Sequence, residues 1–124
     1  MEEILKNKKY DLEERTLAFA KRVRSLVKSM TKTVGNIEDG KQLVRSSGSM
    51  GANYIEANES LSKKDFLMRI KICRKESKET RYWLILLDIP NDQGLESERK
   101  VLIKEATELM LIFSSIMRKT AVKV

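Results

Sequence analysis

The chain has 124 residues, of which 41% are hydrophobic and 35% charged, and its formal net charge is +7. This length and apolar content suit one compact domain, so we expect a single domain over residues 1–124. The sequence contains no His and a single Cys, Cys73, which removes the commonest general base and metal ligand and any intrachain disulfide. We therefore expect no metal, no cofactor and no enzymatic activity.

The first predicted helix covers about residues 11–34. Its apolar residues recur at intervals of three, four and seven, as on one face of an α-helix: Leu12, Phe19, Val23, Leu26 and Met30. Gly35 and Asn36 break this pattern, so the second helix is expected from about residue 38 to about residue 60. The inward face of that helix carries Leu43, Ser47, Met50, Tyr54, Ala57 and Leu61.

The third and fourth predicted helices cover about residues 63–88 and 96–119. Ser62 and Asp65 resemble a capping box, which predicts a helix start near Lys63. Pro90 and the turn residues around it predict the end near Asp88. Four helices joined by three short connections predict an all-α fold, an antiparallel up-down-up-down four-helix bundle. No uncharged apolar run of 18 residues and no signal-peptide pattern exist, which predicts no membrane association and a cytoplasmic location.

The second and third helices each carry a second apolar face. One bundle core buries only one face of a helix, so another protein surface is expected to cover the second. This predicts a homo-oligomer, with tight packing inside one bundle as the alternative explanation for the small residues of the second helix. The predicted interface residues are Val44, Gly48, Ala52, Ile55, Met68, Ile72, Trp83 and Leu86.

A line of polar residues follows the second helix beside these faces, and a matching line follows the third helix. If the two lines face each other, the basic members pair with the acidic ones, because buried charges persist only when paired. We favour a structural network over a ligand site between the helices. The predicted network consists of Arg45, Asn53, Glu56, Arg69, Glu76 and Glu79.

The positive charge is concentrated in two segments. Residues 1–34 and 62–88 each carry a net charge of +4, from nine and eight Lys and Arg against five and four Asp and Glu. A basic ridge of Lys21, Arg24, Lys28 and Lys32 is predicted on the outward side of the first helix. A similar line on the third helix contains Lys71, Lys75 and Lys78, with intervening acids. Such lines attract phosphate without reading sequence, although a solvated basic face is the alternative.

The central stretch "QLVRSSGSMGANYIEANESLSKKDFLMRIKICRKESKETRYWLILL" resembles the central motif of a known bacterial family. The family is that of the 23S rRNA-intervening sequence proteins, and "LEERTLAFAKRVRSLVKSM" is similar to its first helix. The resemblance weakens in the fourth helix. It implies an antiparallel four-helix bundle that assembles as a homopentamer with a central channel. A related group, the accessory proteins of diversity-generating retroelements, is similar in fold and binds a reverse transcriptase and nucleic acid.

Two functional classes follow. The first is an oligomeric protein that binds the phosphate backbone of RNA or DNA through its basic lines. The second is a protein-interaction scaffold, or an accessory subunit of a reverse transcriptase, whose positive charge is incidental. The dependence of nucleic-acid binding on ionic strength separates the two classes.

Overall fold

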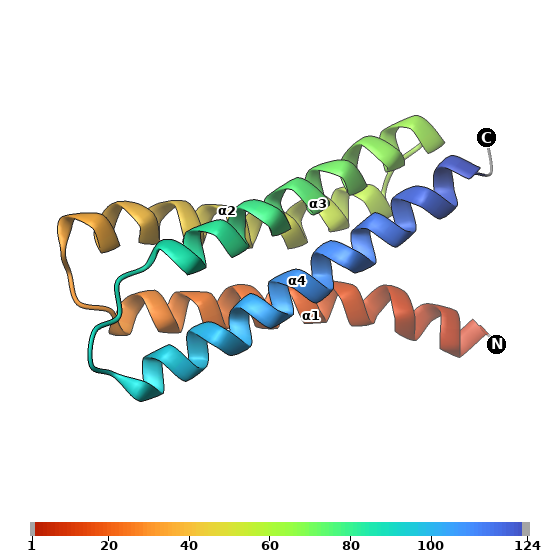
Figure 1. The fold of residues 1–124 in the computed structure, drawn as a ribbon. Helices are drawn as coiled ribbons and strands as arrows, with labels where there is room; N and C mark the ends of the chain where they lie inside the picture. The colour runs from red at the N-terminus through yellow and green to blue at the C-terminus, as the bar shows by residue number, and fades with distance from the viewer. Residues whose placement is uncertain (1, 123–124) are drawn as a thin grey trace.

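The protein folds into four packed helices in a computed structural model that describes the backbone of residues 2–122 and the side chains of residues 12–121. The helices are α1 (Glu2–Ser29), α2 (Val34–Asn58), α3 (Lys63–Leu86) and α4 (Gln93–Val122), and no strand occurs in the described backbone (Figure 1). The predicted all-α class and the four-helix bundle are therefore confirmed.

The helices pack around one hydrophobic core. Contact is most extensive between α2 and α3 and between α3 and α4, less extensive between α1 and α2, and smallest between α1 and α4. The core contains the predicted inward residues of α1, together with Leu84 of α3 and Phe113 of α4. On α2 the predicted inward residues are buried except Leu61, which lies in the connection after Asn58 and is 99% exposed, so that prediction is wrong. The α1–α2 and α3–α4 connections lie at one end of the bundle, and the α2–α3 connection lies at the other (Figure 1).

The boundary between α1 and α2 differs from the prediction. α1 ends at Ser29 instead of near residue 34, and α2 begins at Val34 instead of near residue 38. Thr33 caps α2, because its side chain accepts a hydrogen bond from the backbone N–H of Asn36 at 3.1 Å. Gly35 and Asn36 therefore lie in the first turn of α2 and do not break the chain between two helices.

Asn36 ties the two connections at this end together. Its buried side-chain Nδ2 donates to the carbonyls of Thr31 and Asp88 at 3.0 and 2.9 Å, and its Oδ1 accepts from the N–H of Asp88 at 2.9 Å. The backbone groups of Asp88 are thus bonded to α2, which explains why α3 ends at Leu86 instead of the predicted Asp88.

The other helix ends follow local capping. Ser62 accepts from the N–H of Asp65 at 3.0 Å, so the predicted start of α3 at Lys63 is confirmed. Asp92 accepts from the N–H of Leu95 at 3.0 Å, which places the start of α4 at Gln93, three residues before the predicted start. α4 also continues to Val122, beyond the predicted end at residue 119. In the part of the chain that the structure describes, no helix is long and apolar enough to cross a membrane.

Candidate functional site

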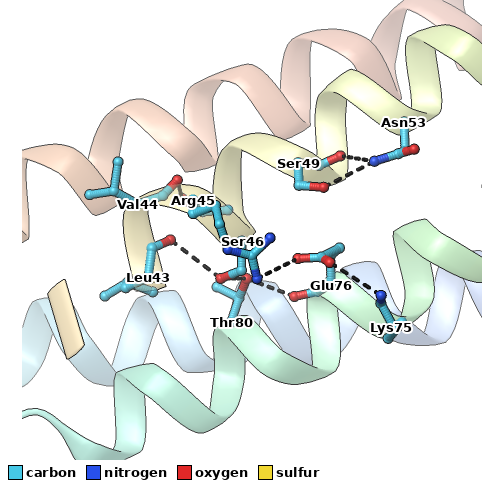
Figure 2. Close-up of polar contacts among 10 residues, drawn as sticks. Leu43, Val44, Arg45, Ser46, Ser49, Asn53, Lys75, Glu76 and Thr80 are labelled. Carbon is cyan, nitrogen blue, oxygen red and sulfur yellow. Dashed lines mark hydrogen bonds and ion pairs between the residues drawn. The ribbon is translucent and has the colours of Figure 1, made fainter. Parts of the chain in front are cut away.

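The seam between α2 and α3 brings together part of the predicted polar network. Arg45 reaches from α2 to the carboxylate of Glu76 on α3, with Nη2 3.7 Å from Oε2 (Figure 2). Lys75 approaches the other carboxylate oxygen, with Nζ 3.7 Å from Oε1. The side chain of Glu76 is only 5% exposed and that of Arg45 is 56% exposed. The carboxylate is therefore buried between two cations that reach it from solvent.

A second group of the predicted network forms nearer the other end of the seam. Arg69 donates from Nη1 to Oδ1 of Asn53 at 3.0 Å. Nδ2 of Asn53 donates to the carbonyl and the hydroxyl of Ser49 (Figure 2). Glu56 is exposed and Glu79 is half-buried. Among side chains 12–121, neither acid has a hydrogen bond or an ion pair through its carboxylate, so the six residues do not form one connected network.

Small hydroxyl residues complete this seam, and the sequence interpretation gave them too little weight. The hydroxyls of Ser46 and Thr80 lie 2.8 Å apart across the two helices, and both residues are fully buried (Figure 2). Ser77 donates within α3 to the carbonyl of Cys73 at 2.8 Å. Burial raises the pKa of the Cys73 thiol to about 12. The Ser and Thr residues at core positions of α2 and α3 could have indicated that these two helices pack closely, because small side chains let two helix backbones approach.

Three of the four glycines of α2, Gly40, Gly48 and Gly51, face α1 inside the same bundle. A Cβ atom at Gly51 would lie 2.9 Å from Oγ1 of Thr16, and one at Gly40 would lie 3.1 Å from Cγ1 of Val27. At Gly48 the nearest atom is Nη2 of Arg24, at 3.3 Å. These contacts support the alternative explanation for the small residues, namely tight packing within one bundle, although Ala52 remains exposed.

A groove between α1 and α2 has a volume of about 640 Å³. Its apolar lining includes Leu17 and Ile55, which are 55% and 50% exposed. Lys21 and Arg24 of the predicted ridge line the same groove, together with the predicted interface residues Gly48 and Ala52. The sequence did not predict that the ridge and the small face border one groove, because it gave no information about how α1 is rotated against α2.

The predicted ridge is exposed, but it is shorter than expected. Lys21, Arg24 and Lys28 are exposed on α1, whereas Lys32 lies in the α1–α2 connection because α1 ends at Ser29. Lys32 therefore does not continue the helical line. The Lys residues of the α3 line, Lys71, Lys75 and Lys78, are all exposed.

Basic residues on the other side of α1 are paired with α4. Nε of Arg15 lies 2.7 Å from Oε2 of Glu105, and Nη2 of Arg22 lies 2.6 Å from Oε1 of Glu98. The hydrogen bond with Glu98 raises the pKa of Arg22 above its ordinary value. By contrast, the three ridge residues on α1 have no ion pair within 4.0 Å among the side chains that the structure describes.

The predicted interface residues lie on two patches. On α2, Val44 and Gly48 are half-buried while Ala52 and Ile55 are exposed, and all four lie toward α1. On α3, Met68 and Leu86 are exposed while Ile72 and Trp83 are half-buried. The indole Nε1 of Trp83 is buried without a hydrogen-bond partner among the described atoms. In the described part of the chain, no group of His, Cys, Asp or Glu residues could hold a metal ion.

These features define a small, basic, all-helical bundle with unpaired cations on its surface. The chain belongs to the 23S rRNA-intervening sequence protein family, whose family model matches residues 8–115. It is similar to the crystal structure of a protein of unknown function from the S23 ribosomal protein family of Bacteroides thetaiotaomicron VPI-5482. The two share 32% sequence identity with a TM-score of 0.71, over 85% of this chain and 96% of the other. No curated protein matches the chain.

Proposed function

We propose that this protein is a non-enzymatic, cytoplasmic homo-oligomer that binds the phosphate backbone of nucleic acid. The observation that carries the proposal is the division of cations on α1. Arg15 and Arg22 are neutralised by glutamates of α4, whereas Lys21, Arg24 and Lys28 carry no ion pair with any described side chain. Unpaired surface cations gain most from phosphate, since binding releases the counterions condensed on the nucleic acid.

The ridge can contact phosphates along one side of the molecule. Lys21 and Lys28 are seven residues apart on α1, which corresponds to about 10 Å along a helix axis. That length is enough for about three phosphates of one stacked strand at their axial spacing of about 3.4 Å. So few contacts give weak binding to a single subunit.

Assembly would raise this affinity. The proposed oligomer is an antiparallel up-down-up-down bundle repeated five times in a ring, as the sequence resemblance implies. The positions of the connections at the two ends of the bundle support that topology (Figure 1). Five subunits would multiply the net charge of +7 fivefold, and a long strand could engage several ridges at once. Linked contacts of this kind raise avidity without any new contact within a subunit.

A protein-interaction scaffold is the second candidate, including an accessory subunit of a reverse transcriptase. The groove between α1 and α2 favours it, because its apolar lining includes the half-exposed Leu17 and Ile55. Exposed apolar surface bordered by charged residues is typical of protein-binding sites. Under this alternative the positive charge has no specific role.

Fluorescence anisotropy with labelled duplex and single-stranded oligonucleotides, measured across a salt series, separates the candidates. We expect the logarithm of the affinity to fall with that of the salt concentration, by about 0.9 per phosphate contact on duplex DNA and about 0.7 on single strands.

The Lys21→Glu, Lys28→Glu double variant should lose most of the binding. A Lys100→Glu, Lys104→Glu variant is the matched control, since both residues are exposed on α4 and the net charge changes equally. Binding that ignores salt, or an equal loss in both variants, would remove the ridge from the function. No binding at low salt would favour the scaffold.

A further inference from the structure

The outer face of α3 carries a line of three exposed cations, of which only Lys75 has an ion pair among the described side chains. Lys71, Lys75 and Lys78 are all exposed, whereas the nearby Glu76 turns inward toward α2 and is 3% exposed (Figure 2). Glu79 is half-buried and follows Lys75 by four residues, so it borders the line on one side, and it has no ion pair within 4.0 Å among the described side chains. Glu76 pairs with Lys75, with Nζ 3.7 Å from Oε1, whereas Lys71 and Lys78 have no ion pair within 4.0 Å among the described side chains.

An exposed aromatic ring stands at the C-terminal end of this line. Tyr82 follows Lys78 by four residues, so the two side chains lie one turn apart on the same side of α3. The residue is 58% exposed. Its ring makes an edge contact with Trp83, with the ring centroids 5.2 Å apart and the planes at 76°. That contact holds the ring in place and leaves much of it open to solvent, which is the arrangement of a stacking platform.

We propose that single-stranded nucleic acid binds along this face, with one base stacked on Tyr82 and the adjacent phosphates on Lys78, Lys75 and Lys71. This inference rests on the proposed function and specifies its ligand. The distance from Lys71 to Tyr82 is eleven residues, or about 16 Å along α3. A stacked strand of about five nucleotides spans that length at about 3.4 Å each, and an extended strand needs fewer.

Stacking selects single strands over duplexes. A base inside a duplex already stacks on its neighbours and exposes no face to a protein ring, whereas an unpaired base can be turned out onto an aromatic side chain. Phosphate contacts alone do not make this distinction, because both forms present phosphates. The α3 face therefore adds a preference for single strands to binding that the ridge on α1 leaves unspecific.

Substitutions at Tyr82 test the stacking. The assay is anisotropy with one labelled oligonucleotide, used alone and annealed to its complement, at fixed salt. We expect Tyr82→Ala to weaken single-strand binding at least fivefold, because one stacked base contributes about 1–3 kcal/mol. Duplex binding and the salt slope should stay unchanged, and Tyr82→Phe should keep the wild-type affinity. Ile85→Ala is the matched control, since Ile85 is 56% exposed one turn farther along α3 and should have no effect.

The outcomes separate this inference from the proposed function. If Tyr82→Ala binds single strands as tightly as the wild type while the α1 double variant loses binding, the stacking site is overturned and the proposed function stands. Equal losses on single strands and duplexes in Tyr82→Ala would also overturn the stacking site. The same holds if light scattering shows that Tyr82→Ala changes the oligomer mass, because Tyr82 would then belong to a subunit interface. If the wild type binds neither nucleic acid at low salt, both proposals fail.

Discussion

Replacing Gly51 with Ala should destabilise the bundle, because the added methyl group meets α1 at a point that cannot yield easily. Its Cβ would lie 2.9 Å from Oγ1 and 3.3 Å from Cβ of Thr16. Thr16 is buried, and its hydroxyl donates to the carbonyl of Leu12 at 2.8 Å. A β-branched side chain in a helix has few alternative rotamers, so α1 and α2 must move apart. Such overpacking costs about 1–3 kcal/mol.

Gly48→Ala is the matched control for this change. Both glycines lie inside α2, so both substitutions gain the same helix propensity of up to about 1 kcal/mol. At Gly48 the new Cβ meets only the end of the flexible Arg24 side chain, at 3.3 Å. The difference in the free energy of unfolding between the two variants therefore isolates the contact with Thr16. We expect Gly51→Ala to be less stable than Gly48→Ala by about 1–3 kcal/mol.

Urea unfolding followed by far-UV circular dichroism measures this difference, at one protein concentration because the proposed assembly would make stability concentration-dependent. Adding Thr16→Ala to Gly51→Ala should recover part of the loss, and a double-mutant cycle gives the size of the coupling. Equal stability of the two single variants, within about 0.5 kcal/mol, would refute the conclusion that Gly51 is small in order to admit α1.

Three further predictions concern buried polar groups. Glu76→Ala should lower the free energy of unfolding by about 1–3 kcal/mol, because the ion pairs of this buried carboxylate are lost. The loss stays in this range because its two cationic partners can still reach water. Glu38→Ala, which removes an exposed pair on α2, should change it by less than about 1 kcal/mol; equal effects in urea unfolding would contradict this reasoning. Asn36→Ala should cost about 2–4 kcal/mol, because it leaves backbone groups of Asp88 without partners; a melting temperature equal to that of the wild type would contradict it. Cys73, with its pKa raised to about 12, should resist thiol reagents at pH 8 until urea unfolds the chain, and rapid labelling of the native protein would contradict its burial.

The linkage of Cys73 to stability has a definite sign. Its pKa in the folded protein lies above the ordinary value near 9, so the folded state holds the thiol proton more tightly than the unfolded chain does. The resulting contribution to stability is fully present below about pH 9 and is lost as the pH rises toward 12. Urea unfolding at alkaline pH should therefore show a decrease that a Cys73→Ser variant shows less strongly.

Helical periodicity predicted the fold well because it depends on residues close in sequence. The inward residues of α1 and α2, except the exposed Leu61, and the cap at Ser62 follow from local patterns, and the core and the hydrogen bond to Asp65 agree. The error at the end of α3 depends on distant residues, whereas the starts of α2 and α4 depend on the local caps Thr33 and Asp92. The local pattern around Asn36 predicts a helix break. Its hydrogen bonds to Asp88 join positions 52 residues apart, and no local pattern indicates them.

The candidate site was predictable in composition but not in arrangement. Exposure of the ridge followed from the spacing of Lys21 and Lys28, which lie opposite the core residues of α1. The pairing of Lys75 with Glu76 was missed, because a helical projection separates adjacent residues by about 100° and takes no account of long flexible side chains. The groove was missed for another reason: it depends on the rotation of α1 against α2, which no local pattern in the sequence indicates.

The proposed assembly and the proposed nucleic-acid binding predict a linkage that one added charge can test. Ala52 is exposed on the α2 patch and lines the groove between α1 and α2. If this patch contacts another subunit, Ala52→Lys places an unpaired charge in that interface, which is strongly unfavourable, and the oligomer should dissociate. The variant has one more positive charge than the wild type, yet it should bind a long strand more weakly, since avidity depends on linked subunits.

Ala121→Lys adds the same charge at an exposed position on α4 and should keep both the mass and the affinity. Light scattering and anisotropy on the same samples measure the two effects. An Ala52→Lys protein of wild-type mass would remove the α2 patch from the interface, and a dissociated protein with undiminished affinity would show that binding does not depend on assembly.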